Sequence, residues 1–229
     1  MRLTDDGMAY HGDVVWSLHQ TGGKGQRGRQ WQDEPGSNLA MSIICQPSLP
    51  ADSQFRLSAL VALTIAKYLQ TIFSGWQVAI KWPNDIYIND KKACGILIEN
   101  IFRGMEWTYA IIGIGINVNQ QSFPDNIPNA VSLKSASGKS YDLAELVTDI
   151  RAGILNALST TQTRADTQKL MDNYNNLLFR RGREVAFEEL ASGRKFEAFV
   201  QEVNSNGELV VLSHSGIETF AFGSVSWKI

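Results

Sequence analysis

A glycine-rich loop near the start of the sequence carries three cationic side chains. Residues 23–28 read Gly-Lys-Gly-Gln-Arg-Gly, and an arginine follows directly, so the cations are Lys24, Arg27 and Arg29. Glycines leave the backbone free to fold around a ligand, and its amides together with charged side chains can enclose an anion. The loop therefore predicts anion binding, with an exposed basic turn as the alternative.

The same loop has the G-x-G-x-x-G pattern of a dinucleotide-binding fold, but its surroundings do not fit that fold. A dinucleotide site requires a helix that begins at the last glycine and receives the pyrophosphate at its N-terminus. Residues 29–36 contain a proline and a second glycine and are typical of a loop. We therefore exclude a Rossmann-type site.

A second polar segment follows an expected strand. Residues 81–85 read Lys-Trp-Pro-Asn-Asp, which places Asn84 and Asp85 just beyond a sheet. Their oxygens could hold nucleotide hydroxyls or a magnesium ion. The alternative is an Asn-Asp turn between two strands.

Two further segments could contribute to a site. Lys92 precedes an apolar strand and could point inward as a fixed cation, or it could be a solvated hairpin lysine like Lys91. Gly113 and Gly115, at the end of another apolar strand, would let a ligand approach the backbone, and Asn117 could pair with its polar edge. A bulge in a buried strand is the alternative for this glycine pair.

Hydrophobic periodicity predicts the elements that would position these residues. Apolar residues at helical spacing predict helices over residues 52–73, 141–158 and 166–179. Short strands are predicted at residues 13–18, 38–45, 78–82, 86–88, 95–101 and 107–112. The polar stretch 120–140 is predicted to be a mobile loop. These elements predict an α+β domain over residues 1–180, with a mixed sheet flanked by helices.

The pattern changes after residue 180. Four short strands, at residues 185–187, 195–203, 208–213 and 217–222, are separated by turns such as Asn206-Gly207. They predict a small antiparallel β-barrel over residues 181–229.

Composition limits the classes of function. The 229 residues contain 21 Lys and Arg against 23 Asp and Glu, for a formal net charge of −2, which disfavours a general nucleic-acid or membrane binder. Two cysteines in apolar contexts fit a reduced cytosol, and three scattered histidines form no metal-ligand spacing. With no signal peptide or membrane-spanning run in the sequence, we expect a cytoplasmic protein.

In their order and spacing, these segments together resemble the biotin–protein ligase family. The match covers residues 20–31, 35–39, 81–85, 92–99, 112–117 and 130–133, and it extends to the C-terminal barrel. The resemblance implies a fold related to class II aminoacyl-tRNA synthetases, followed by an SH3-like barrel. It also implies ATP-dependent activation of biotin to biotinyl-5'-AMP and transfer to a lysine of a biotin carboxyl carrier protein.

The resemblance assigns roles position by position. The implied biotin site consists of Gln20, Gly23, Lys24, Lys92, Gly95, Gly113 and Gly115. The implied ATP or adenylate contacts are Lys24, Gly25, Gln26, Arg27, Arg29, Trp31, Asn84 and Asn117. Asp85 falls in the magnesium region. Lys92, Arg27 and Arg29 would be the catalytic cations, because a carboxylate that attacks an α-phosphate brings two anions together, and no protein nucleophile is needed.

Three departures from the family pattern bear on activity. The family usually has arginine at the positions of Lys24 and Gln26; lysine loses bidentate geometry and glutamine loses the charge. The family also has a Ser-Thr-Asn motif upstream of the position of Gln20. We expect that part of the biotin site to be missing from this sequence, through truncation or a misplaced start. The helix-turn-helix of repressor-type members also has no counterpart here.

These departures leave alternatives open. The implied partners are biotin, ATP with Mg²⁺, and a biotin carboxyl carrier domain, with neither DNA nor membrane, and a homodimer is left open. A lipoate–protein ligase shares the fold and the adenylation chemistry. A non-catalytic adenylate- or carrier-binding homologue is the alternative from a different class of function.

Overall fold

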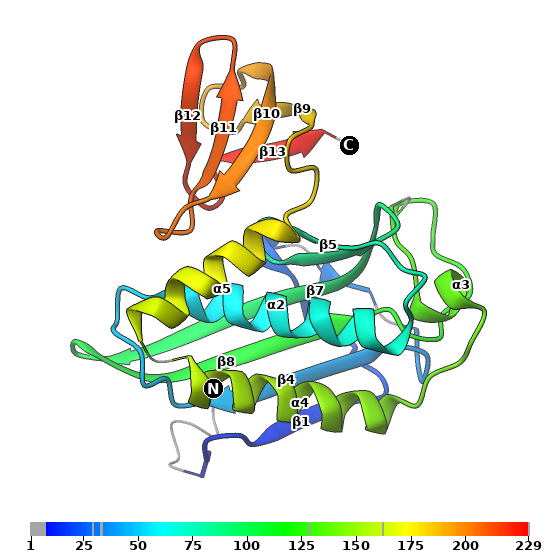
Figure 1. Cartoon of the computed structure of the whole chain (residues 1–229). Helices are drawn as coiled ribbons and strands as arrows, with labels where there is room; N and C mark the ends of the chain where they lie inside the picture. The colour runs from blue at the N-terminus through cyan, green and yellow to red at the C-terminus, as the bar shows by residue number, and fades with distance from the viewer. Residues whose placement is uncertain (1–7, 29, 33, 128, 162, 229) are drawn as a thin grey trace.

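A six-stranded antiparallel sheet forms the centre of the molecule (Figure 1). The computed structural model describes residues 8–28, 30–32, 34–127, 129–161 and 163–228. The sheet has the order β1-β4-β8-β7-β6-β5. Its strands are β1 (Val14–Ser17), β4 (Leu39–Cys45), β5 (Val78–Lys81), β6 (Asp85–Ile88), β7 (Lys91–Arg103) and β8 (Glu106–Ile116). Neighbouring strands run antiparallel at each of its junctions, and a parallel bridge joins Ile80 to Leu178 beside it.

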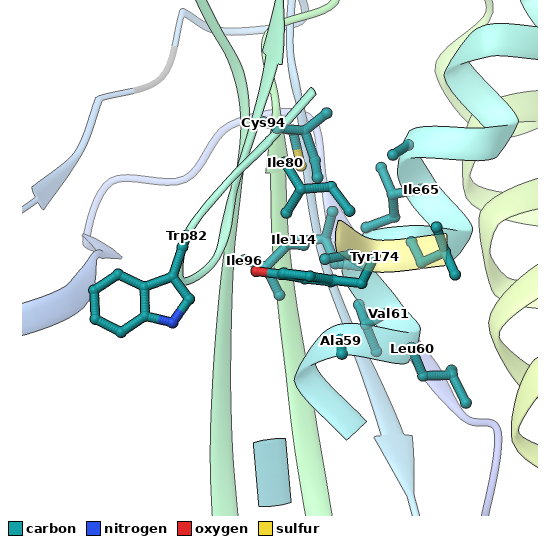
Figure 2. Packing of buried hydrophobic residues seen from close by; sticks show 14 of the residues in the cluster. Ala59, Leu60, Val61, Ile65, Ile80, Trp82, Cys94, Ile96, Ile114 and Tyr174 are labelled. Carbon is teal, nitrogen blue, oxygen red and sulfur yellow. The ribbon is translucent and has the colours of Figure 1, made fainter. Parts of the chain in front are cut away.

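Three helices cover one face of this sheet (Figure 1). They are α2 (Gln54–Ile72), α4 (Leu143–Thr160) and α5 (Arg164–Asn176), and a short helix, α3 (Leu133–Ser137), lies beyond one end of the sheet. Along α2 the buried residues recur at helical spacing, so this helix packs its apolar side on the sheet. Figure 2 shows Val61 and Ile65 of α2 close to Ile96 and Ile114 of the sheet, around the ring of Tyr174. The core of the domain therefore lies between sheet and helices.

Alternation along β8 decides which side chains face this core. Ile112, Ile114 and Ile116 are buried, whereas Gly113 and Gly115 between them are only partly covered. Successive side chains of a strand point to opposite faces. The isoleucines therefore pack under the helices, and the two glycines lie on the other face of the sheet.

A second sheet occupies the C-terminal part of the chain (Figure 1). This C-terminal sheet has the order β12-β11-β10-β9-β13, and all of its pairs are antiparallel. Its strands are β9 (Glu184–Glu189), β10 (Lys195–Val203), β11 (Leu209–Ser213), β12 (Gly216–Phe220) and β13 (Val225–Lys228). Aromatic residues pack in its interior, where the buried ring of Phe187 lies 5.5 Å from the partly buried ring of Phe196.

Buried hydrogen bonds join the C-terminal sheet to helix α5 and to Trp82, the residue after β5. The side-chain amide of Asn175 in α5 donates to the Val203 carbonyl at 3.0 Å and accepts from the Val203 N–H at 2.8 Å. Trp82 Nε1 donates to the Gly207 carbonyl at 2.9 Å. These contacts cross the predicted domain boundary at residue 180. That boundary stays a prediction.

The structure departs from the predicted elements in three places. Helix α3 lies inside the stretch 120–140 predicted as a mobile loop, and β13 was not predicted. The glycine-rich loop is not irregular throughout: it contains the short strands β2 (Gly23–Lys24) and β3 (Gln30–Trp31), which pair around a 3₁₀ turn, η1 (Gln26–Gly28). We call residues 22–31 the glycine hairpin. Among the described residues, no helix has both the length and the apolar character needed to cross a membrane.

We expect Asn175→Ala to destabilise the junction of the two sheets. The change leaves the N–H and the carbonyl of Val203 buried without their partners, which costs about 2 to 4 kcal/mol of the free energy of unfolding. Urea denaturation measures this loss. Asn173→Ala, on the same helix but outside this pair of hydrogen bonds, is the control. Equal stability of the two variants would contradict a role for the Asn175 amide.

Candidate active site

A cavity of about 420 Å³ lies on the face of the sheet opposite the helices, beneath the glycine hairpin. It brings together residues that are far apart in the sequence. Of the predicted site residues, those that line it are Gln20, Lys24, Gly25, Gln26, Trp31, Asn84, Asp85, Lys92, Gly95, Gly113 and Gly115. We call it the central cavity. It continues into a second cleft, of about 970 Å³, whose wall includes Gly23.

An ion pair fixes the cation predicted to be catalytic. Lys92 Nζ lies 2.7 Å from Asp85 Oδ1, and 35% and 20% of the two side chains are exposed. A register shift in the pairing of β6 with β7 sets Lys92 opposite Tyr87 and leaves Asp85 opposite Gly95. The ammonium group is therefore held at the wall of the cavity by a partner on the neighbouring strand.

The backbone of Lys92 is held as well. Its N–H donates to the Asn129 carbonyl at 2.8 Å, and its carbonyl accepts from the Val131 N–H at 2.9 Å. These bonds form a short parallel bridge between β7 and the segment that precedes α3. One set of contacts thus holds the backbone of Lys92, and a separate contact orients its side chain.

Paired glycines make room for the indole of Trp31. Gly95 and Gly115 lie opposite each other on β7 and β8. A Cβ atom at Gly115 would lie 2.5 Å from Trp31 Cε2, and one at Gly95 would lie 3.2 Å from Trp31 Cζ3. Gly23 has the same function within the hairpin, because its Cβ would lie 2.7 Å from the Trp31 carbonyl oxygen. These glycines let an aromatic ring lie directly on the sheet as one wall of the cavity.

Two predicted nucleotide contacts are engaged by the protein itself. The Asn117 side chain is 5% exposed and donates to the carbonyls of Lys92 and Val131, at 3.4 and 3.3 Å. It is not part of the cavity wall, so here it ties β7 to the segment before α3. Asn84 does line the cavity, and its amide donates to the Ile96 carbonyl.

Two of the three predicted catalytic cations fall outside the described structure. Arg29 lies outside the described residues, and so does the side chain of Arg27, whose backbone belongs to η1. Their roles stay predictions. Lys92 and Lys24 are the predicted cations that the structure places at the cavity.

The sequence did not reveal one wall of the cavity. This wall consists of residues of β1 and β4, and the unpredicted lining residues are Val15, Trp16, Ser17, Ala40, Met41 and Ser42. Pairing of β1 with β4 brings them together, with Trp16 opposite Met41. The sequence held one indication of this wall, because alternation along the predicted strand 13–18 places Val15 and Ser17 on one face.

The described residues give this site neither a thiolate nor a cluster of metal-binding side chains. Burial raises the pKa of the Cys94 thiol, and the nearby Asp85 carboxylate raises it further, so Cys94 stays a neutral thiol. Within the described residues, no three His, Cys, Asp or Glu side chains form a group that could hold a metal ion. The Asp85 carboxylate instead forms an ion pair with Lys92.

Comparison with known proteins agrees with this geometry. Residues 7–117 match the model of the biotin/lipoate A/B protein ligase family. Over 145 residues the chain is 41% identical to the bifunctional ligase/repressor BirA of Bacillus spizizenii, a match that covers 62% of the chain and 44% of that relative. Over 206 residues it is 24% identical to the biotin–[acetyl-CoA-carboxylase] ligase of Mycobacterium tuberculosis, covering 86% of the chain and 72% of the relative.

The solved structures confirm the predicted fold class. Biotin protein ligase from Aquifex aeolicus in complex with biotin and ATP superimposes with a TM-score of 0.81 at 25% identity, covering 96% of this chain and 90% of that one. The fold is therefore that of the biotin protein ligases, with an SH3-like C-terminal sheet. Over residues 7–117, just under half of its length, the chain is similar to the biotin/lipoate A/B protein ligase family. It spans less than half the length of the BirA relatives that it matches.

On the expectation from the sequence that the central cavity binds biotin, Gly115→Ala should weaken that binding by displacing Trp31. The new methyl group would overlap the indole, and the ring would have to move into the cavity. A loss of about tenfold in affinity, roughly 1.4 kcal/mol, is expected by isothermal titration calorimetry. The double variant Gly115→Ala/Trp31→Phe should recover part of that loss, because the smaller ring leaves room for the methyl group. A double variant that binds no better than Gly115→Ala would refute this account.

Proposed function

We propose that the chain is an ATP-dependent biotin–protein ligase, which activates biotin as its adenylate and transfers it to a lysine of a carrier protein. The observation that carries the proposal is the Lys92 ammonium, held by Asp85 at the wall of a cavity that Gly113, Gly115 and Trp31 also line. A compact ring can rest beside the Trp31 indole, and its carboxylate side chain can extend toward the cation.

The first half-reaction brings two anions together. A carboxylate oxygen of biotin attacks the α-phosphorus of ATP, the bond from that phosphorus to the β-phosphate oxygen breaks, and pyrophosphate leaves. Lys92 and Lys24 lower the repulsion between carboxylate and phosphate, because both are at the cavity where the groups must meet. The glycine hairpin above the cavity can shield the adenylate from water.

The second half-reaction needs an external amine. The deprotonated ε-amine of the carrier lysine attacks the acyl carbon, a C–N bond forms, and the C–O bond to AMP breaks. AMP leaves with the electron pair of that bond, and the proton of the nitrogen is released to solvent. The neutral, buried Cys94 takes no part, so no covalent acyl-enzyme is included in the proposal.

Biotin is favoured over lipoate by the relatives. The Mycobacterium tuberculosis relative is named a biotin–[acetyl-CoA-carboxylase] ligase, and the Aquifex aeolicus structure contains biotin and ATP. Lipoate stays the alternative substrate, because the matching family model includes both kinds of ligase.

Several further expectations belong to this proposal. Magnesium would enter with the phosphates of ATP, since the described residues form no cluster for a resident metal and Asp85 is paired with Lys92. The acceptor would be a biotin carboxyl carrier domain, in the cytoplasm. We also propose that the chain binds neither operator DNA nor membranes, and a homodimer stays open.

We expect biotin and MgATP together to raise the melting temperature more than either ligand alone. The adenylate formed from them would occupy both halves of the central cavity, and a ligand that binds only the folded state stabilises it more the more tightly it binds. Differential scanning fluorimetry measures the shift. Lipoate with MgATP is the comparison, and a larger shift with lipoate would move the assignment to the lipoate ligases.

We expect Lys92→Ala to remove most adenylate formation and to leave the fold intact. Loss of one preorganised cation at developing negative charge costs on the order of a hundredfold in rate. Lys91→Ala is the matched control, because the neighbouring residue is exposed on the same strand and does not line the cavity. Biotin-dependent pyrophosphate release measures both. Equal rates in the two variants would show that Lys92 takes no part in adenylate formation and is only a solvated hairpin lysine.

A further inference from the structure

The second cleft opens directly from the central cavity. Its wall includes Lys24, Asn84 and Glu99, which line the central cavity too. At about 970 Å³ it has more than twice the volume of the central cavity, about 420 Å³. A path therefore leads from the reacting groups to a larger recess between the N-terminus of α2, the outer half of β7 and the C-terminal sheet.

The C-terminal sheet supplies a preformed wall of this cleft. The turn before β11 is pressed against α2, because a Cβ atom at Gly207 would lie 2.3 Å from Phe55 Cγ. The same turn accepts a hydrogen bond from Trp82, at 2.9 Å. Phe222 packs edge-on against Trp82, with ring centroids 6.3 Å apart, yet it stays 55% exposed. An aromatic surface is thus held open beside the path.

The charges around the cleft favour a cation. Among the described lining side chains, the carboxylates of Asp52, Glu99 and Glu208 face one ammonium group, that of Lys24. Within the described residues, the Asn100 Oδ1 atom is buried without a hydrogen-bond partner and would accept one. Among these described side chains the carboxylates outnumber the ammonium group, so an incoming lysine would be attracted.

We propose that the second cleft docks the lysine-bearing turn of the acceptor protein, with apolar side chains beside that lysine packed against Phe55 and Phe222. The inference rests on the proposed function and adds the surface on which the acceptor protein binds. Glu208 and Asp52 steer the ammonium group toward Glu99, where the two cavities meet. Phe222 supplies the exposed aromatic contact that commonly dominates the affinity of a protein interface.

The experiment separates docking from adenylate formation. Binding of a fluorescently labelled biotin carboxyl carrier domain is measured by anisotropy, without biotin or ATP, and biotin-dependent pyrophosphate release is measured separately. Phe222→Ser should weaken carrier binding about tenfold or more and leave pyrophosphate release within about twofold of the unmodified chain. Phe199→Ser is the matched control, because Phe199 is 43% exposed on the C-terminal sheet and does not line the cleft.

A second pair of variants tests the charge. Glu208→Gln keeps a side chain that can accept the hydrogen bond from Asn204, and it should weaken carrier binding, most clearly at low salt. Glu197→Gln, at an exposed position of β10, should leave carrier binding unchanged.

Each outcome decides the proposal. Equal binding by Phe222→Ser and Phe199→Ser would overturn it, and so would a Phe222→Ser variant whose defect is a raised Michaelis constant for ATP. Binding that depends on Phe222 in a chain that forms no adenylate would support the docking surface and refute the proposed enzyme activity. The two proposals therefore fail separately.

Discussion

The ion pair between Lys92 and Asp85 is the contact on which the candidate site depends. Two neighbouring strands place these residues, and the register shift between β6 and β7 determines that they meet on the cavity side. An isolated surface pair contributes little to stability. Its importance here is directional: a long, flexible lysine is kept pointing at the place where substrate anions would meet, before any substrate arrives.

A buried polar network extends this control to the segment between β8 and α3. Asn38 donates to Gln120 at 2.6 Å and accepts from the Val118 N–H at 3.0 Å, and Ser132 donates to the Gln120 carbonyl at 2.6 Å. Buried amides are costly unless they are paired, so such a network specifies one arrangement. Because the same segment forms the backbone bridge to Lys92, the position of the cation is coupled to residues that lie outside the cavity wall.

The sequence predicted the elements with strong periodicity and the residues with strong chemistry. Glycines at positions 113 and 115 indicated close approach to a sheet, and the structure places Trp31 against Gly115 and its strand partner Gly95. Helix α3 was missed because it is five residues long and buries one of them, and its capping box of Ser132 and Ser135 looks like loop sequence. Asn117 was assigned to the ligand because a single polar residue after a strand does not show whether it faces a cavity or a neighbouring backbone. Such a choice is made by tertiary packing.

Among the described side chains of the site, Lys92 is a cation whose direction is set by an ion pair within the protein. Lys24 is exposed, and Gln26 carries no charge, although both line the central cavity. A substrate carboxylate or phosphate then competes with Asp85 for the Lys92 ammonium. Because that pair is partly exposed to water, its mutual attraction is modest, and the substrate anions can draw the ammonium away from Asp85. Asp85 thus orients the Lys92 ammonium but still lets it move to a substrate anion. A site where two anionic ligands meet requires this property.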